Sequence, residues 1–549
     1  MTQFVKYPDF AMKKEYFLPV CLLDSGNATK TEELFAEKRA GVSFRTDNLA
    51  LLQGKGAFLL LDFGKELCGG VRLITRLAPE NAKLRITFGE SVAEACSTIG
   101  VKGACNDHSP RDMTVAVSMM SDLEFGQTGF RFARIELLTE GELGLISVYG
   151  YCLTPDFPNE ASIVTNDGVL NKIIETAAYT LKLTFQNHYI WDGIKRDRLV
   201  WCGDLHPEIL TSLYWFGNTP NVKNSLRFLR ENTPEGTWVN TIPTYSAWWV
   251  INAIDYADIT GDDAFLAESE NYIQSVLDAF DACVSDDGTM HFGENLDMEF
   301  YLDWPTFETA DAVVGSASLL ILAAKKYLQK KDHAGAKRIC EKLQRYLQQP
   351  VSHKQIRAFQ ILAGGDSTAA AEYLEKNGAE GMSTFMAYYI LSAPASAGGT
   401  QILSMLKSYY GAMLQRGATT FWEDFDLAWL EGSSRIDKMP AAGEKDLHGD
   451  YGKYCYQGFR HSLCHGWAAG VLAFIVEHIA GLKITDGGKN ITVQPHMDGL
   501  TDLDAVLPTA AGNVQIHIHG DSREIILPKQ KGEMYGYIRK YQPVSAAEK

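Results

Sequence analysis

A helical period first appears in Leu170-Asn-Lys-Ile-Ile-Glu-Thr-Ala-Ala-Tyr-Thr-Leu181, where apolar residues recur every three or four positions. The stretch follows a turn-rich segment, Pro155-Asp-Phe-Pro-Asn159, which ends an earlier strand pattern. Helical periodicity then continues to about residue 480, for example in the apolar stripe from Phe265 to Phe280. Because no repeat of fixed length accompanies it, a closed ring of helical hairpins is favoured over an open solenoid. We expect a helical barrel over residues 159–483.

The segments on both sides of this region have the alternation of β-strands. Before it, Lys83-Leu-Arg-Ile-Thr-Phe88 and Gly129-Phe-Arg-Phe-Ala-Arg-Ile135 alternate in polarity. After it, Val514, Ile516 and Ile518 alternate between Gly and Pro turns. The fold class predicted is therefore a multidomain α and β protein. It has an N-terminal β-sandwich over residues 1–158, the central barrel, and a small C-terminal β-sandwich over residues 484–549.

The composition is that of a folded, acidic protein. The chain has 549 residues, 46% of them apolar, and a formal charge of −17. Such a charge repels nucleic acid and anionic lipid, so neither is expected as a partner. Residues 1–23 carry five charged side chains among the apolar ones, which argues against an export signal. Every apolar run is shorter than the ~18–20 residues that span a bilayer. We expect a cytoplasmic protein.

Charged residues are densest in Trp191-Asp-Gly-Ile-Lys-Arg-Asp-Arg-Leu-Val-Trp-Cys-Gly-Asp204. Pro207 follows closely and suits the first turn of a helix, so the stretch is predicted to be an ordered loop that leads into a helix. One interpretation is a structural network of Asp–Arg ion pairs. The other is a pocket in which carboxylates perform acid–base chemistry and Trp201 offers a flat face to a ring. Spacing alone leaves both open.

Acid–base hydrolysis of an acetal needs a second carboxyl group on the other side of the bond. The candidate is Glu423 in Ala418-Thr-Thr-Phe-Trp-Glu423, next to Trp422. His465, in Cys464-His-Gly-Trp467, follows 42 residues later. Taken alone, a glutamate after a tryptophan is more often a surface or capping residue, and a lone histidine on an apolar helix is more often a core residue.

Taken together, these motifs resemble the bacterial α-L-rhamnosidases of glycoside hydrolase family 78. The resemblance spans most of the chain and rests on Asp192 to Asp204, Leu302-Asp-Trp-Pro305, Ala418 to Glu423, and His465 with Ala480-Gly481. Leu61-Asp-Phe-Gly64, Phe88-Gly-Glu90 and Gly129-Phe-Arg-Phe132 look like that family's β-sandwich. The resemblance implies an (α/α)6 barrel of six hairpins between β-sandwich domains, and inversion at the anomeric carbon.

The resemblance also implies residue roles. Glu423 matches the general base that activates water. The family's general acid lies in a segment one residue longer than Arg196-Asp-Arg-Leu-Val-Trp201. Alignment from Trp201 puts Asp197 at the acid position, whereas alignment from Arg196 leaves the acid missing; we assign Asp197. The residues expected to line the sugar subsite are Asp192, Arg196, Trp201, Asp204, Trp304 and His465, with Tyr245, Trp248 and Trp422 as further aromatic contacts.

Neighbouring charges act on the pKa of Asp197 in opposite directions. Arg196 and Arg198 favour its ionised form, which suits a base or ligand better than an acid. The other pocket carboxyl groups crowd negative charge together, which raises the pKa of at least one member. Inversion further predicts that acid and base lie about 6.5–9.5 Å apart.

We therefore expect an exo-acting, inverting α-L-rhamnosidase whose partner is a rhamnose-containing small glycoside or oligosaccharide. It would need no cofactor or metal, because two carboxyl groups supply both proton transfers. A homodimer is compatible with the sequence. Two alternatives stay open. One is another six-hairpin glycosidase with a different sugar specificity, and the other is a carbohydrate-binding protein that lost catalysis through the shortened loop.

Overall fold

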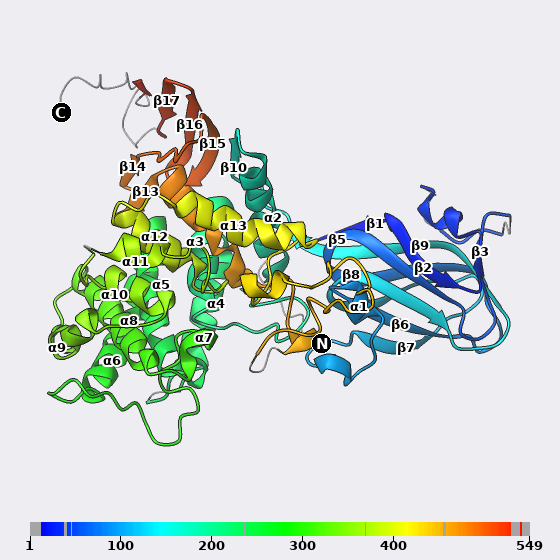
Figure 1. Ribbon diagram of the computed structural model, residues 1–549, viewed down its shortest axis with the longest axis horizontal. Coiled ribbons are helices and arrows are strands. Elements are labelled where there is room, and N and C mark those ends of the chain that lie inside the picture. Colours follow the sequence, from blue (N-terminus) through cyan, green and yellow to red (C-terminus); the bar gives the residue numbers. More distant parts are fainter. Residues whose placement is uncertain are drawn as a thin grey trace, which may run out of the picture.

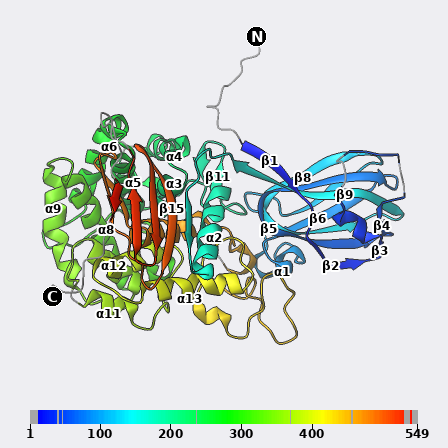
Figure 2. The same cartoon turned by 90° about the horizontal axis from the view of Figure 1, so that it is seen from above.

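The computed structural model describes residues 12–37, 41–44, 47–234, 236–367, 369–453, 457–528 and 538–540. Figures 1 and 2 show a β-sheet region at one end of the molecule and a helical region beside it. A second, smaller sheet lies against the helices. The predicted order of strands, helices and strands along the chain is confirmed at this level.

The N-terminal region is one hydrogen-bonded network of nine antiparallel strands. Their order is β3-β4-β9-β5-β8-β6-β7, with β1 added to β9 and β2 to β5. The two patterns quoted from the sequence lie in β6 and β8, which pair with Ile86 opposite Ile135. The strands are β1 (Met12–Phe17), β2 (Cys21–Gly26), β3 (Ala28–Thr29), β4 (Ala50–Gln53), β5 (Phe58–Leu77), β6 (Lys83–Gly89), β7 (Asp112–Ala116), β8 (Asp122–Leu137) and β9 (Glu142–Pro155), with the short helices η1 (Thr31–Phe35), α1 (Val92–Ala95) and η2 (Val101–Gly103).

The first predicted helix is α2 (Gly168–Thr184), and its apolar stripe from Leu170 to Leu181 is buried. Asp167 caps it by accepting hydrogen bonds from the backbone N–H groups of Val169 and Leu170. The further helices are α3 (Leu205–Trp215), α4 (Pro220–Glu231), η3 (Val239–Thr241), α5 (Pro243–Thr260), α6 (Asp263–Ala282), α7 (Trp304–Phe307), α8 (Asp311–Leu328), α9 (Ala334–Leu343), η4 (Gln344–Gln348), α10 (Lys354–Leu362), α11 (Ala370–Glu375), α12 (Ala387–Ser396), α13 (Ile402–Gln415), η5 (Leu427–Leu430), η7 (Gly458–Arg460), η8 (Gly466–Ala469), α14 (Gly470–Phe474) and η9 (Ile475–Ile479).

The C-terminal sheet includes a strand from far earlier in the chain. Strand β10 (Ser162–Thr165) pairs with β15, and the sheet order is β10-β15-β16-β17-β18. Sequence analysis placed this strand in the helical region, because four residues carry too little alternation to be recognised and their partner lies more than 300 residues away. The other strands are β11 (Phe185–Gln186), β12 (Tyr189–Ile190), β13 (Leu482–Thr485), β14 (Asn490–Val493), β15 (Asp502–Thr509), β16 (Gly512–His519), β17 (Ser522–Ile526) and β18 (Ile538–Lys540).

The length and hydropathy of the helices bear on membrane insertion. Among the described residues, no helix is both long and apolar enough to cross a bilayer.

Candidate active site

The charged loop between β12 and α3 is closed by its own hydrogen bonds. The Asp192 backbone N–H donates to the Leu199 carbonyl at 3.0 Å, and the Asp192 carboxylate accepts from the Leu199 N–H at 2.9 Å. Inside the loop Asp197 and Arg198 adopt left-handed φ angles of 58° and 55°, which few non-glycine residues do. The Arg198 N–H donates to the Arg196 carbonyl at 2.8 Å. The loop is therefore a tight, ordered turn.

This loop forms one wall of a cavity of about 230 Å³. The volume lies below the ~300–1,000 Å³ of drug-sized pockets, and it suits a group as small as one sugar ring. Aromatic and charged side chains share its surface. The lining residues are Arg196, Asp197, Trp201, Asp204, Ile242, Tyr245, Met298, Tyr301, Trp304, Arg460 and Trp467.

The structure brings most of the predicted site residues together at this cavity. Six of them line it: Arg196, Asp197, Trp201, Asp204, Tyr245 and Trp304. Asp192, Glu423 and His465 are buried and contact the lining residues or one another.

Trp248 and Trp422 are not placed at the cavity. Trp248 is one helical turn deeper along α5 than Tyr245, is fully buried, and packs against His206, Phe359 and Tyr389. Trp422 is 1% exposed and its ring packs against Phe425. Both rings pack in the helical core and do not line this cavity, so their contact with a sugar stays a prediction.

The guanidinium group of Arg196 links the two predicted catalytic carboxylates. Its Nη2 donates to Glu423 Oε1 at 2.5 Å, and its Nη1 donates to Asp197 Oδ2. Its Nε donates to the Arg460 carbonyl at 2.8 Å, which fixes the plane of the group. Charge-assisted hydrogen bonds of this kind are among the strongest in proteins. Asp197 and Glu423 therefore flank one buried cation.

Glu423 is held from several sides. The Ser462 N–H donates to Glu423 Oε2 at 2.8 Å, and the Glu423 N–H donates to the Ser462 carbonyl at 3.0 Å. The indole N–H of Trp467 donates to the Glu423 carbonyl at 2.9 Å, and the Thr384 hydroxyl donates to the same oxygen at 2.5 Å. Both carboxylate oxygens thus accept hydrogen bonds, which fix the position of the carboxylate.

The ring of His465 lies between three carboxyl groups. Its Nε2 is 3.6 Å from Glu423 Oε1 and 3.9 Å from both Asp192 Oδ2 and Asp204 Oδ1. A β-bridge to Gly193 holds its backbone against the charged loop. Burial, together with the charge of Arg196, lowers the pKa of His465 well below its ordinary value. The ring is therefore neutral near pH 7, with one N–H to donate.

Burial raises the pKa of two further carboxyl groups of the site. Burial raises the pKa of Asp204 to about 8, although the hydrogen bond from the Tyr245 hydroxyl, at 3.0 Å, opposes the shift. Burial, and then the charges of Asp197 and Asp204, raises the pKa of Asp192 well above its ordinary value. The expected rise in pKa is found at these two residues, and burial causes more of it than crowding does.

Comparison with known proteins finds a similarity in the first half of the helical region. Residues 158–324 match the sequence model of the bacterial alpha-L-rhamnosidase 6 hairpin glycosidase domain. A search of curated proteins found no match to the chain.

Several solved rhamnosidases share the fold. A rhamnosidase from Klebsiella oxytoca with rhamnose bound is 19% identical, with a TM-score of 0.64, over 85% of this chain and 96% of that one. The GH78 family rhamnosidase of Bacillus sp. GL1 is 19% identical, with a TM-score of 0.69, over 89% of this chain and 53% of that one. The chain thus spans about half the length of the Bacillus enzyme and nearly all of the Klebsiella enzyme.

Several residues at this cavity were not predicted from the sequence. Tyr301 and Met298 line the cavity just before the quoted Leu302-Asp-Trp-Pro305 motif, and Arg460 and Trp467 line it on either side of His465. Trp467 stood within the quoted Cys464-His-Gly-Trp467, so its proximity to His465 was an available signal. No pattern in the sequence singled out Met298 or Arg460.

Proposed function

We propose that the protein is an exo-acting α-L-rhamnosidase that removes terminal non-reducing α-L-rhamnose from small glycosides or oligosaccharides with inversion. The observation that carries the proposal is the pairing of Asp197 and Glu423 on one guanidinium group beside a cavity of single-sugar size. Inverting hydrolysis needs two carboxyl groups, one to protonate the leaving oxygen and one to activate water. The family match of residues 158–324 supports the sugar specificity.

In this proposal Glu423 is the general base and Asp197 the general acid. Glu423 accepts hydrogen bonds at both oxygens, and an ionised carboxylate in that state can take a proton from water. Asp197 lines the cavity, and its Oδ1 lies 3.2 Å from Nδ1 of His108, which the N-terminal region supplies.

Asp204 is a second candidate for the acid. It lines the same cavity, and its pKa of about 8 means that it holds a proton at neutral pH, as a general acid must. The assignment of Asp197 depends on the resemblance, and that of Asp204 on its burial. The dependence of Asp197→Asn and Asp204→Asn on the leaving group distinguishes the two candidates.

The remaining groups fit a 6-deoxy sugar. Trp201, Tyr245, Tyr301 and Trp304 present aromatic surface to the cavity, which suits the apolar ring face and the methyl group of rhamnose. Asp192, Asp204, Arg196 and His465 supply acceptors and donors for hydroxyl groups. No cofactor or metal is required in this scheme, because the carboxyl groups supply both proton transfers.

The architecture we propose is an (α/α)6 barrel over residues 159–483 between β-sandwich domains over residues 1–158 and 484–549, except that β10 belongs to the C-terminal sheet. A cytoplasmic location stays a prediction, and the formal charge of −17 disfavours nucleic acid and anionic membranes as partners. A homodimer is the proposed assembly, and light scattering of the purified chain would test it.

Hydrolysis of p-nitrophenyl α-L-rhamnopyranoside beside other p-nitrophenyl glycosides tests the proposed activity. Proton NMR identifies the anomer released first, and β-L-rhamnose is expected. Release of rhamnose alone from the non-reducing end of an oligosaccharide would support exo action. Turnover of a different glycoside would instead support a glycosidase of other specificity. Binding of rhamnose in calorimetry without any turnover would support a non-catalytic sugar-binding protein.

A further inference from the structure

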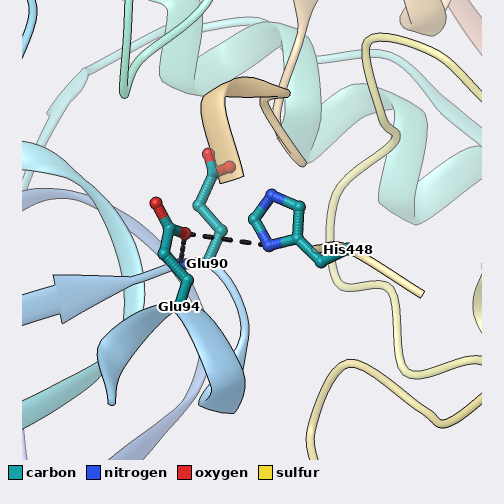
Figure 3. Close-up of side chains that lie close together, drawn as sticks. All are labelled: Glu90, Glu94 and His448. Carbon is teal, nitrogen blue, oxygen red and sulfur yellow. Dashed lines mark hydrogen bonds and ion pairs between the residues drawn. The ribbon is translucent and has the colours of Figure 1, made fainter. Parts of the chain in front are cut away.

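A buried cluster of ionisable side chains lies beside the proposed active site, at the contact with the N-terminal region. Glu90, Glu94 and His448 face one another, with ligand atoms within 4.8 Å (Figure 3). Glu90 and Glu94 come from the end of β6 and from α1, and His448 comes from the loop between η5 and η7. Two carboxylates and one imidazole are a donor set that a metal ion could use.

Lys195 contributes its ammonium group to this cluster, beside the buried Arg111, whose Nε lies 3.7 Å from Glu94 Oε1. Its Nζ lies 3.0 Å from Glu90 Oε2, 3.2 Å from Glu94 Oε1 and 3.5 Å from His448 Nε2. Burial acts to lower the pKa of Lys195, but the charges of Glu90 and Glu94 outweigh it and raise the pKa above its ordinary value. Lys195 is therefore charged, and it balances the carboxylates where a metal ion would otherwise be needed.

Lys195 also reaches the segment that holds the catalytic base. Its Nζ donates to the Phe459 carbonyl at 2.9 Å and to the His461 carbonyl at 2.6 Å. The carbonyl between them, that of Arg460, accepts from Nε of the adjacent Arg196. Two neighbouring side chains of the charged loop thus bind three consecutive carbonyl groups, which fixes the loop against residues 459–461.

The same cluster holds the next two residues of that segment. Glu90 Oε2 accepts from the Leu463 N–H at 2.5 Å, and Glu90 Oε1 accepts from the Ser462 hydroxyl at 3.1 Å. Ser462 in turn donates its N–H to Glu423. Ser462 therefore links Glu90 of the N-terminal region to Glu423, the proposed base. Lys195 is the neighbour of Arg196 in the sequence.

We propose that Lys195 is a positioning residue, which uses Glu90 and Glu94 of the N-terminal region as an anchor to hold Arg196 and the Ser462 N–H against Glu423. The N-terminal region is on this account part of the catalytic machinery and not only a neighbouring domain. The kinetic consequence rests on the proposed function, whereas the geometric consequence does not.

The test compares three variants of the full chain. Lys195→Met removes the ammonium group and leaves the two buried carboxylates Glu90 and Glu94 with Arg111, whose Nε is 3.7 Å from Glu94 Oε1, as a counter-charge, which destabilises the fold. Lys195→Met/Glu94→Gln removes both charges and keeps Glu90 in place, so the fold recovers while the contacts to the Phe459 and His461 carbonyls stay lost. Arg131→Met is the matched control. Arg131 is a buried cation of the N-terminal region that pairs with Asp62 and donates to the Gly417 carbonyl at 3.0 Å.

The expected result is a separation of stability from turnover. In the double variant the thermal midpoint returns toward that of the wild type, KM changes little, and kcat stays about a hundredfold low, the effect typical of a displacement of 1 Å. Arg131→Met should lower the midpoint and leave kcat near that of the wild type. A double variant with wild-type kcat would overturn the proposal, because Lys195 would then only compensate charge.

A crystal structure of the double variant decides the question without substrate. The distance from Arg196 Nη2 to Glu423 Oε1, 2.5 Å in the wild type, should exceed hydrogen-bonding range. Its retention would overturn the positioning role. If the wild type does not hydrolyse the aryl rhamnoside, the proposed function fails, and this distance still tests the inference about Lys195.

Discussion

Arg196 and Glu423, 227 positions apart in the chain, are joined by a hydrogen bond of 2.5 Å from Nη2 to Oε1. Both side chains are almost fully buried, at 3% and 1% exposure. Because Nη1 of the same guanidinium donates to Asp197, the spacing of the two proposed catalytic groups is set by one rigid, planar cation. The predictions below depend on that arrangement.

Glu423→Gln should lower kcat by about 10²–10⁴-fold with little change in KM, because an amide cannot take a proton from water. Steady-state kinetics on an aryl rhamnoside measures the effect. Glu477→Gln is the control, since Glu477 is a half-buried carboxylate that accepts hydrogen bonds from Tyr214 and Tyr388 and does not line the cavity. A similar loss of kcat in both variants would indicate general damage to the helical core.

Asp197→Asn and Asp204→Asn should differ in their dependence on the leaving group. Dinitrophenolate is a stable anion that departs without a proton. A sugar alkoxide is a poor leaving group and must be protonated as it departs. The variant that lacks the general acid should therefore lose about 10²–10⁴-fold in kcat/KM on a rhamnose disaccharide and far less on dinitrophenyl rhamnoside.

We expect this selective loss in Asp197→Asn, with Asp204→Asn losing activity equally on both substrates. The opposite pattern would show that Asp204, and not Asp197 in the shortened loop, is the general acid. Kinetics of both variants on both substrates, with the wild type beside them, is the measurement.

Asp204→Asn should also flatten the pH dependence of stability. Burial raises the pKa of Asp204 from 3.8 to about 8, so between these values the folded state keeps a proton that the unfolded state has released. Its contribution to stability is complete below the lower value and is lost as pH rises through the upper one. The slope is at most about 1.4 kcal/mol per pH unit.

Denaturant unfolding of the wild type and of Asp204→Asn, at about pH 5 and about pH 7, measures this contribution. The asparagine resembles the protonated acid, so the variant should lose less stability than the wild type as pH rises. A difference between the two proteins that is the same at both pH values would show that Asp204 titrates near its ordinary pKa.

The sequence predicts some parts of this molecule because their signals are local. The stripe from Leu170 to Leu181 repeats within one helix, and the motifs around Asp197 and Glu423 each lie in a few consecutive residues. The strand β10 was not predicted because its partner, β15, is distant in sequence. Lys195 was not singled out because its role depends on Glu90 and Glu94, which lie about a hundred positions earlier and carry no spacing signal.

Trp304→Ala and Trp248→Ala should separate the binding of sugar from the stability of the fold. Trp304 lines the cavity at the start of α7, where the Asp303 carboxylate caps the helix. Loss of an aromatic contact worth about 1.4 kcal/mol should raise KM about tenfold, with little change in the free energy of unfolding. Trp248 is fully buried in the helical core, so its removal should cost about 3–5 kcal/mol of stability.

Calorimetric titration with rhamnose and denaturant unfolding of both variants make the comparison. The two indoles lie on different helices, and Trp304 lines the cavity whereas Trp248 does not. One substitution should therefore change rhamnose binding and the other the free energy of unfolding. If Trp248→Ala weakened rhamnose binding at unchanged stability, its ring would reach the sugar after all. If Trp304→Ala lowered only stability, Trp304 would be a core residue, and the aromatic surface of the cavity would be that of Trp201, Tyr245 and Tyr301.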